Sequence, residues 1–386
     1  MLITSRNYLT TRFAFSIAIP EICRLNFAHR MKKHNYSAGP SILPQEVFQK
    51  ASQAILDFNG SGLSLLEISH RSKDFVAVMD EARALALQLL GLTGKGYQAL
   101  YLQGGASMEF LRIPYNLLKQ NGKAAYLDTG TWASSAIKEA KAFGETVVVA
   151  SSKADNYTYI PKDYTIPGDA DYFHCTSNNT IFGTQMKNFP DTQVPLVCDM
   201  SSDIFSRQLD FSKFDLIYAG AQKNMGPAGV TLIVIKEDLL GKTGRDIPSI
   251  LDYKQHIDKE SMYNTPAVFA VYTSLLTLQW LNALGGIGAL EKQNNAKAEM
   301  LYNEIDRNPL FTGTARTEDR SPMNATFVLN DISHEASFDK MWKEAGISGL
   351  TGHRSVGGYR ASMYNALPIE SVEVLVEVMK MLEVIG

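Results

Sequence analysis

One lysine, Lys223, lies in a segment that could carry out chemistry. It follows an apolar run that ends at Tyr218, within Ala219-Gly220-Ala221-Gln222-Lys223-Asn224-Met225-Gly226. Most lysines are solvated surface charges, and an arbitrary lysine at a strand end would be interpreted in that way. Here small residues on both sides leave room for a bulky group, and strand ends in open α/β sheets are where ligands bind. Because a lysine in such a crevice can lose its proton and form a Schiff base, the segment indicates covalent chemistry.

Two other glycine-containing segments resemble nucleotide-binding loops, but their spacing fails. Gly241-Lys242-Thr243 follows a strand-like run, yet the glycine that a Walker A loop needs five positions before Gly241 is replaced by Lys236. Gly286-Ile287-Gly288 lies between two expected helices, and Glu291 occupies the third glycine position of a dinucleotide fingerprint. No nucleotide site is therefore predicted.

Short apolar runs alternate with helical patterns along much of the chain. Strands buried on both faces appear as continuous apolar runs, and their alternation with helices is typical of a mainly parallel α/β sheet. The expected strands are 99–102, 124–127, 146–150, 172–175, 196–198, 216–218, 230–235, 325–329 and 359–363. The expected helices are 44–58, 75–90, 108–118, 132–143, 267–284, one beginning near 288, 337–345 and 370–384.

Breaks in this pattern predict the domain boundaries. The 386 residues exceed the usual size of a single core. Because Gly285-Gly286 interrupts the helical pattern, we expect a large domain over 46–288 and a smaller α+β C-terminal domain over 289–386. An N-terminal arm, 31–45, is expected to join the small domain. Residues 1–30 contain four arginines and one acid, as a transit segment would, but Met31 resembles a natural start, which favours a non-native or disordered extension.

Composition excludes several other classes of protein. A net charge of −3, from 37 basic and 40 acidic residues, gives no general reason to expect nucleic acid or an anionic membrane as partner. No stretch offers 18 consecutive apolar residues. Cys23, Cys175 and Cys198 are too few and too unpatterned for a disulfide framework or a zinc site, so no metal is expected. These features are typical of an enzyme of the reducing cytoplasm.

Around Lys223 and in several other segments, the sequence resembles the phosphoserine aminotransferases, which are class-V, fold-type I enzymes that use pyridoxal 5'-phosphate (PLP). The resemblance extends from about Asn35 to the C terminus and implies a PLP-dependent transferase of fold type I. The motifs that carry it, besides the Lys223 segment, are Ser37-Ala38-Gly39-Pro40, Glu67-Ile68-Ser69-His70-Arg71-Ser72, Ser134-Ser135-Ala136-Ile137-Lys138-Glu139-Ala140-Lys141, Pro248-Ser249-Ile250-Leu251-Asp252-Tyr253, Asn264-Thr265-Pro266 and Gly352-His353-Arg354-Ser355-Val356-Gly357-Gly358-Tyr359-Arg360-Ala361-Ser362.

The resemblance implies a role for each residue around the PLP ring. Lys223 would hold the cofactor and be the catalytic residue. Asp199 matches the acid that keeps the pyridine nitrogen protonated, although an isolated Asp after a strand is more often a turn residue. Trp132 matches the stacking residue, although core packing is the usual role of Trp. Thr180 matches the residue that hydrogen-bonds the ring hydroxyl.

The cofactor phosphate is expected at the segment Gln103 to Ser107, where a strand end, glycines and a helix start provide free backbone N–H groups. The resemblance assigns the phosphate to Ala106, Ser107 and Gln222, with Asn264 and Thr265 reaching it from the neighbouring subunit of a homodimer with shared active sites. The loop departs from the commoner glycine-rich version at Ala106, Met108 and Glu109. Glu109 would disfavour a bound dianion unless it points away, which leaves the contacts of the loop open.

The substrate site is implied by clustered cations. His70-Arg71 and His353-Arg354 are two His-Arg pairs far apart in sequence that the fold could bring together, and Arg360 matches the residue for the substrate α-carboxylate. A planar guanidinium can bind both oxygens of a carboxylate, although any one arginine is usually a solvated charge. These cations suit substrates that carry a phosphate and carboxylates.

The implied activity is phosphoserine:2-oxoglutarate aminotransferase, which exchanges an amino group between glutamate and 3-phosphohydroxypyruvate in serine biosynthesis, with ping-pong kinetics. Use of 4-phosphohydroxythreonine in vitamin B6 synthesis stays open. One alternative is another fold-type I activity, such as a desulfurase or an alanine–glyoxylate aminotransferase, which would not need the paired His-Arg cations. Another is a catalytically inactive binding homologue, which would be expected to have lost Lys223 or Asp199.

Overall fold

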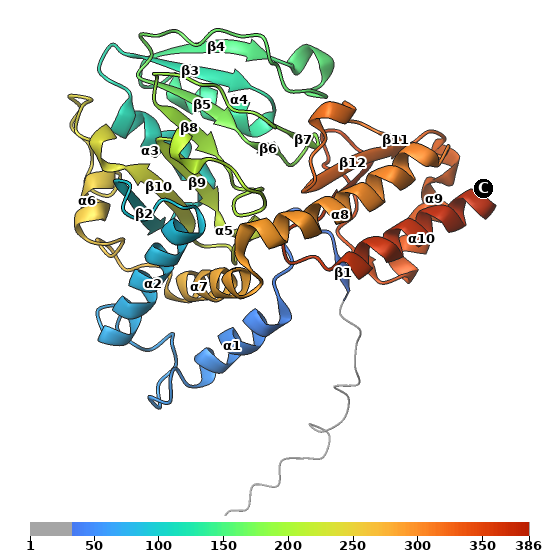
Figure 1. The fold of residues 1–386 in the computed structure, drawn as a ribbon, viewed down its shortest axis with the longest axis horizontal. Helices are drawn as coiled ribbons and strands as arrows, with labels where there is room; N and C mark the ends of the chain where they lie inside the picture. The colour runs from blue at the N-terminus through green and yellow to red at the C-terminus, as the bar shows by residue number, and fades with distance from the viewer. Residues whose placement is uncertain (1–32, 386) are drawn as a thin grey trace, which may run out of the picture. The chain divides into compact units, whose positions relative to one another are not determined.

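A seven-stranded sheet forms the centre of the fold in the computed structural model, which describes residues 33–385 (Figure 1). The strand order is β2-β10-β9-β8-β5-β3-β4. Their bounds are β2 (Tyr97–Leu102), β3 (Lys123–Asp128), β4 (Glu145–Ser151), β5 (Tyr172–Thr176), β8 (Leu196–Asp199), β9 (Leu216–Gly220) and β10 (Thr231–Lys236). All are parallel except β10, which runs antiparallel to β2 and β9. The predicted α/β fold with a mainly parallel sheet is confirmed.

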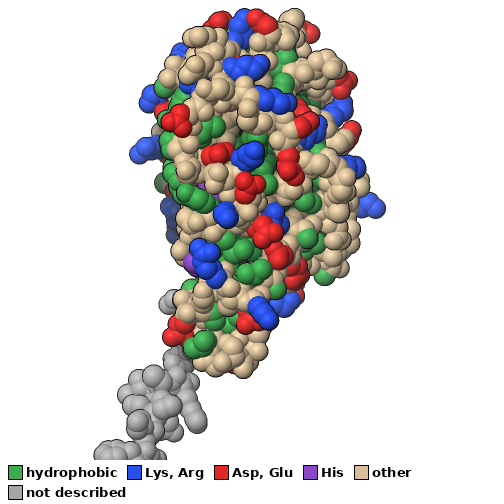
Figure 2. All heavy atoms as spheres, turned by 90° about the vertical axis from the view of Figure 1, so that its left-hand side faces the viewer, with side chains coloured by type: hydrophobic (Ala, Val, Ile, Leu, Met, Phe, Trp, Pro, Cys, Tyr) green, Lys and Arg blue, Asp and Glu red, His purple; other side chains and the backbone are tan. Residues whose placement is uncertain are grey.

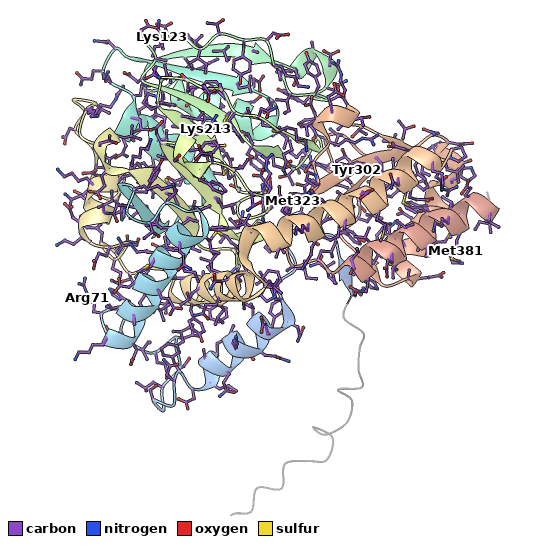
Figure 3. All side chains as sticks on the ribbon, in the orientation of Figure 1. Arg71, Lys123, Lys213, Tyr302, Met323 and Met381 are labelled. Carbon is purple, nitrogen blue, oxygen red and sulfur yellow. The ribbon has the colours of Figure 1, made fainter. Side chains whose placement is uncertain are left out.

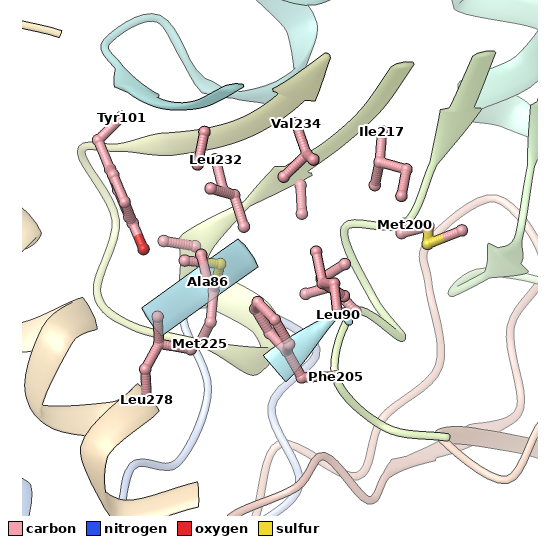
Figure 4. Close-up of a cluster of buried hydrophobic side chains, with 14 of the residues drawn as sticks. Ala86, Leu90, Tyr101, Met200, Phe205, Ile217, Met225, Leu232, Val234 and Leu278 are labelled. Carbon is pink, nitrogen blue, oxygen red and sulfur yellow. The ribbon is translucent and has the colours of Figure 1, made fainter. Parts of the chain in front are cut away.

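Helices cover both faces of this sheet. On one face α2 (Lys73–Leu89) and α7 (Val268–Ala283) pack over the first core, part of which Figure 4 shows. On the other face lie α3 (Gly105–Leu117), α4 (Thr131–Ala140) and α6 (Tyr253–Asp258). α1 (Gln45–Leu56) packs against α7. Because both faces are covered, β5, β8 and β9 are buried along their whole length, which explains their continuous apolar runs.

A second core lies under a three-stranded antiparallel sheet of order β11-β12-β14. Its strands are β11 (Phe311–Gly313), β12 (Asn324–Leu329) and β14 (Tyr359–Ser362), and its helices are α8 (Gly286–Arg307), α9 (Glu335–Glu344) and α10 (Ile369–Ile385). Near the start of the described chain, β1 (His34–Asn35) pairs with β13 (Ile347–Ser348), and Tyr36 enters this core. α8 contributes Ile287 to the first core and Leu301 to the second, and the chain from His34 onward is one compact unit. The domain boundary at 288 stays a prediction.

Several short elements are absent from the sequence prediction. They are β1, β6 (Asn178–Asn179), β7 (Thr184–Gln185), β11, β13, α5 (Ala221–Asn224) and α6. Segments of two to six residues are too short to show a periodic pattern. The one that matters most is α5, because this single helical turn carries Lys223.

The remaining predictions concern the ends of the chain, the cysteines, metals and membranes. Residues 1–30 lie outside the described residues, as does Cys23, whereas Cys175 and Cys198 are buried free thiols. Within 33–385 no group of three or more His, Cys, Asp or Glu side chains could hold a metal ion. No single helix in this range is long and apolar enough to cross a membrane, and α7 and α8 meet that criterion only as a pair bent by 85°. Figure 2 shows acidic and basic side chains interspersed on one face.

Candidate active site

Lys223 lies at the carboxyl end of β9, where the structure brings several predicted site residues together. Its Nζ donates a hydrogen bond to Thr180 Oγ1 at 3.1 Å and lies 5.5 Å from the centre of the Trp132 ring. The Ser41 hydroxyl donates to the Lys223 carbonyl, and the Ser41 N–H donates to the Gln222 carbonyl at 3.0 Å. The N-terminal arm therefore holds the turn that carries Lys223.

The surroundings of the Lys223 amine favour its neutral form. Burial is the largest influence and lowers the pKa of Lys223; Asp199 opposes this effect, Arg360 adds to it, and Asp203 again opposes it. A neutral amine is the form that attacks a carbonyl carbon or takes up a proton. Lys223 is thus suited to both tasks.

Asp199 ends β8, the strand next to β9, and only 5% of its surface is exposed. The Ser201 N–H and hydroxyl both donate to its Oδ1, at 2.9 and 2.6 Å. No hydrogen bond is formed to its other oxygen, Oδ2, within residues 33–385. Asp199 therefore has one oxygen held by the protein and one available to a proton on a ligand.

The predicted phosphate loop forms the start of α3, where backbone N–H groups have no acceptor in the described chain. Gly104, with φ of +115°, turns the chain from β2 into α3, and a Cβ at this position would lie 2.6 Å from Met108 Cβ, so only glycine fits. No acceptor in the described chain binds the N–H groups of Gly105, Ala106 or Ser107. Such free amides at the positive end of a helix dipole suit an anion.

Trp132 lies between the phosphate loop and Lys223. It lines the same cavity of about 450 Å³ as Gly104 and Ser107, and its ring faces the Lys223 amine. Its indole Nε1 is buried and, within 33–385, has no hydrogen-bond partner. A buried donor without a partner is unusual, which suggests that a ligand group satisfies it.

Glu109 points away from the phosphate loop, which answers the question that the sequence left open. It is fully buried between α3 and α6, paired with Arg112 and bonded by the Tyr253 hydroxyl. Burial raises the pKa of Glu109, whereas Arg112 and Tyr253 lower it. Its charge is therefore compensated inside the protein and does not oppose an anion at Ser107.

Replacing Arg112 with methionine should destabilise the protein in a pH-dependent manner. Glu109 would lose its cation, so its already raised pKa would rise further. A carboxyl group whose folded pKa lies above its unfolded value stabilises the fold at low pH, and that stability is lost as the pH rises through the folded pKa. We expect a loss of about 3–5 kcal/mol near pH 8 and a smaller loss near pH 5, measured by urea unfolding. The pH dependence should vanish in the double variant Glu109→Gln/Arg112→Met; an equal loss at both pH values in the single variant would contradict this interpretation.

Two of the predicted substrate residues line a cavity of about 590 Å³. His353 and Arg360 share this cavity with Thr131, Tyr157 and Ile181. Arg360 Nη1 lies 3.5 Å from the Thr180 carbonyl, and its buried Nε is without a partner in the described part of the chain. Burial lowers the pKa of His353, and the cations Arg360 and Arg354 lower it further. The cavity therefore presents to a bound molecule a guanidinium whose Nε has no partner in the described chain.

Four other predicted residues, Asn264, Thr265, His70 and Arg71, do not line this cavity. Asn264 Nδ2 donates to Gln103 Oε1 at 2.6 Å, and Gln103 Nε2 donates to the Thr265 carbonyl at 3.1 Å, so this segment borders the phosphate loop of its own chain. His70 and Arg71 precede α2 and do not line the cavity of His353 and Arg360. Figure 3 places Arg71 beside the start of α2, away from the three-stranded sheet. A single chain thus does not bring the two His-Arg pairs together.

Three residues of the site were not predicted. Ser41 follows the Ser37-Ala38-Gly39-Pro40 motif, whose end could have drawn attention to it. Asp203 is buried and binds Ser177, Gln185 and Arg207 close to Asp199. Tyr157 lines the cavity, and its hydroxyl donates a hydrogen bond to Asp128. No pattern in the sequence indicates this role of Tyr157.

Comparison with known proteins agrees with this geometry. The profile of the family described as aminotransferase class-V matches residues 34–375. Phosphoserine aminotransferases of Flavobacterium psychrophilum and Bacteroides fragilis are 78% and 58% identical to this chain, each over 92% of it and 99% of the relative.

Two solved structures are also similar. That of phosphoserine aminotransferase from Bacillus circulans subsp. alkalophilus has a TM-score of 0.88 and 45% identity, covering 91% of this chain and 98% of that one. That of PLP-bound phosphoserine aminotransferase from Trichomonas vaginalis has a TM-score of 0.86 and 35% identity, covering 90% and 100%. The chain belongs to the class-V aminotransferase family and, within it, to the phosphoserine aminotransferases.

Proposed function

We propose that the protein transfers an amino group reversibly between glutamate and 3-phosphohydroxypyruvate, giving phosphoserine and 2-oxoglutarate, with PLP as cofactor. The observation that carries this proposal is the placement of the Lys223 amine between Trp132 and Thr180, with Arg360 Nη1 bonded to the Thr180 carbonyl and lining a cavity together with His353. The names of the relatives support the same substrates.

The residues present fit PLP. Asp199 Oδ2 is free to pair with a protonated pyridine nitrogen, the Trp132 Nε1 donor lacks a partner in the described chain, and the amides at the start of α3 are free for a phosphate. The Gln222 side chain, which makes no hydrogen bond within 33–385, is available to the same phosphate. When bound, PLP withdraws electrons from the bonds at the substrate Cα.

Each residue of the chain then has a defined task. The Lys223 amine would move a proton between the substrate Cα and the C4′ carbon of the cofactor. The Asp199 carboxylate would hold the proton on the pyridine nitrogen, and Trp132 would lie against the ring. Thr180 orients the Lys223 amine and the ring hydroxyl. The two substrates react in turn, which gives ping-pong kinetics.

Arg360 is proposed to bind the substrate α-carboxylate through both oxygens, with His353 and Arg354 beside the phosphate. His70 and Arg71 would complete the site from the second subunit of a homodimer, where Asn264 and Thr265 would also reach the partner's cofactor. Two observations support the dimer. Leu56, Leu63 and Leu66, before His70, are 76%, 50% and 60% exposed, and the buried His70 Nε2 has no partner in the described chain.

The phosphate group of the keto acid should strongly increase kcat/KM for amino transfer. With glutamate as donor, we expect kcat/KM for 3-phosphohydroxypyruvate to exceed that for hydroxypyruvate by about 10²-fold or more, because the cations would be left without their anion. Arg360→Lys keeps the charge but loses the two-oxygen contact, so it should lower kcat/KM about tenfold for both keto acids. Equal rates with the two keto acids would rule out the substrate assignment, and 4-phosphohydroxythreonine can be tested as donor in the same assay.

A further inference from the structure

Three buried asparagines cap three consecutive backbone carbonyls in the turn that follows Asp199. The bonds run from Asn224 Nδ2 to Ile204, from Asn365 Nδ2 to Phe205 at 3.2 Å and from Asn294 Nδ2 to Ser206 at 3.1 Å. The three side chains come from α5, from the segment after β14 and from α8. We call these three residues the asparagine cluster.

The asparagine cluster is also bonded within itself. The Asn365 N–H donates to Asn224 Oδ1 at 3.0 Å, and Asn294 Nδ2 donates to Asn365 Oδ1 at 2.9 Å. None of the three side chains is more than 5% exposed. A buried amide is costly unless it is bonded, and Asn is a poor helix former, so local structure alone gives no reason for Asn294 inside α8. Its role lies in the tertiary contact.

The capped turn is strained at its centre. Phe205 has φ of +58°, a conformation that costs a bulky residue about 1–3 kcal/mol and persists only when the surroundings impose it. Its ring is buried in the first core, where Figure 4 shows it close to Leu90. The asparagine cluster supplies hydrogen bonds on both sides of this residue and so holds the turn in place.

The asparagine cluster joins the elements that carry three site residues. Asn224 directly follows Lys223 in α5, and the capped turn begins immediately after Asp199. Asn365 lies just beyond β14, the strand that carries Arg360. Lys297 of α8 secures that last segment by donating to the carbonyls of Met363, Tyr364 and Leu367.

We propose that Asn224, Asn294 and Asn365 are positioning residues, which hold the Lys223 amine at a set distance from the Asp199 carboxylate and the Arg360 guanidinium. This inference rests on the proposed function, in which Lys223 moves the proton. The groups that face the Lys223 amine are Thr180, Trp132, Asp199, Asp203 and Arg360. Because charge interactions depend on distance, a looser cluster changes the proton affinity of Lys223 without removing any group that touches substrate.

The experiment compares Asn294→Ala and Asn365→Ala with the control Asn308→Ala. Asn308 is equally buried and makes three hydrogen bonds, to Glu304, Met379 and Leu310, but it has no contact with the Lys223 turn. Two quantities are measured. The first is the pH midpoint of the absorbance of PLP bound through Lys223. The second is amide hydrogen exchange over residues 221–226 in the cofactor-free protein.

In both cluster variants we expect the midpoint to shift by about one pH unit, and kcat to fall about tenfold with KM for glutamate changed less than about twofold. Exchange over 221–226 should accelerate. Asn308→Ala should lower the melting temperature by a similar amount, but it should leave the pH midpoint, kcat and the exchange over 221–226 unchanged. Unchanged midpoint and exchange in the cluster variants would overturn the inference. If Asn365→Ala does not fold, Asn294→Ala carries the test, because it leaves the Asn365 side-chain bond to the Phe205 carbonyl in place. A wild-type protein that transfers no amino group from glutamate in the presence of PLP would instead overturn the proposed function, and the exchange result would still decide the role of the asparagine cluster.

Discussion

Lys223→Ala should lower the rate of amino transfer by about 10⁴-fold or more, the largest effect that we expect of any single replacement. The variant loses both the amine that links to the cofactor and the base that moves the Cα proton. Asp199, Trp132 and the start of α3 remain, so PLP should still bind without a covalent link. The measurement is single-turnover transfer from glutamate, combined with borohydride reduction and peptide mapping, which should place the reduced pyridoxyl group of the wild type on Lys223.

A matched control is Lys236→Met, which removes a half-buried lysine on the neighbouring strand β10 that pairs with Asp215 at 2.8 Å. It should keep close to full activity, and added methylamine should restore part of the activity of Lys223→Ala. Trapping on a different lysine, or a Lys223→Ala variant of normal rate, would contradict the assignment.

The same variant tests the proposal that two subunits share each active site. Lys223→Ala and Arg71→Ala homodimers should each be nearly inactive. If Arg71 serves the partner's site, subunit exchange between them should restore about a quarter of the sites, because half of the dimers are hybrids with one intact site. No recovery after verified exchange would place Arg71 outside the partner's site.

Asp199→Asn should lower kcat by about 10²–10³-fold, the second large effect. The variant keeps the shape of the side chain and can still accept the two Ser201 bonds at Oδ1, but it has no charge at the position of Oδ2. Without that charge the pyridine nitrogen holds its proton less firmly, and the cofactor withdraws electrons less well. Steady-state kinetics with glutamate and 3-phosphohydroxypyruvate give the change, which should appear in kcat and much less in KM.

The control is Asp203→Asn, which removes a second buried carboxylate nearby. Asp203 is bonded by Ser177, Gln185 and Arg207, so its loss should reduce stability more than kcat. If Asp199→Asn retained more than about a tenth of the wild-type kcat, the carboxylate would not be supporting the cofactor in the proposed manner.

Much of the fold follows from local patterns in the sequence. The seven central strands were predicted from short apolar runs, which are most continuous where a strand is buried along its whole length, as β5, β8 and β9 are. α1 was predicted from apolar spacing, and the break between α7 and α8 from the pair Gly285-Gly286, both of which have positive φ in the structure. The antiparallel direction of β10 was not predicted, because a buried apolar strand has the same composition in either direction.

By itself, the sequence determined which residue types the chemistry requires and the motifs that contain them: Lys223 among small residues, Asp199 after a strand, glycines before a helix, and paired cations. Only the tertiary structure decided how these parts meet. Glu109 points away from the phosphate loop because Arg112 and Tyr253 compensate it, and His70 and Arg71 do not reach Arg360 within one chain. The asparagine cluster joins residues 224, 294 and 365. The physical reason is that hydrogen bonds between distant segments depend on packing in three dimensions. Local patterns of residue type along the chain do not reveal this packing.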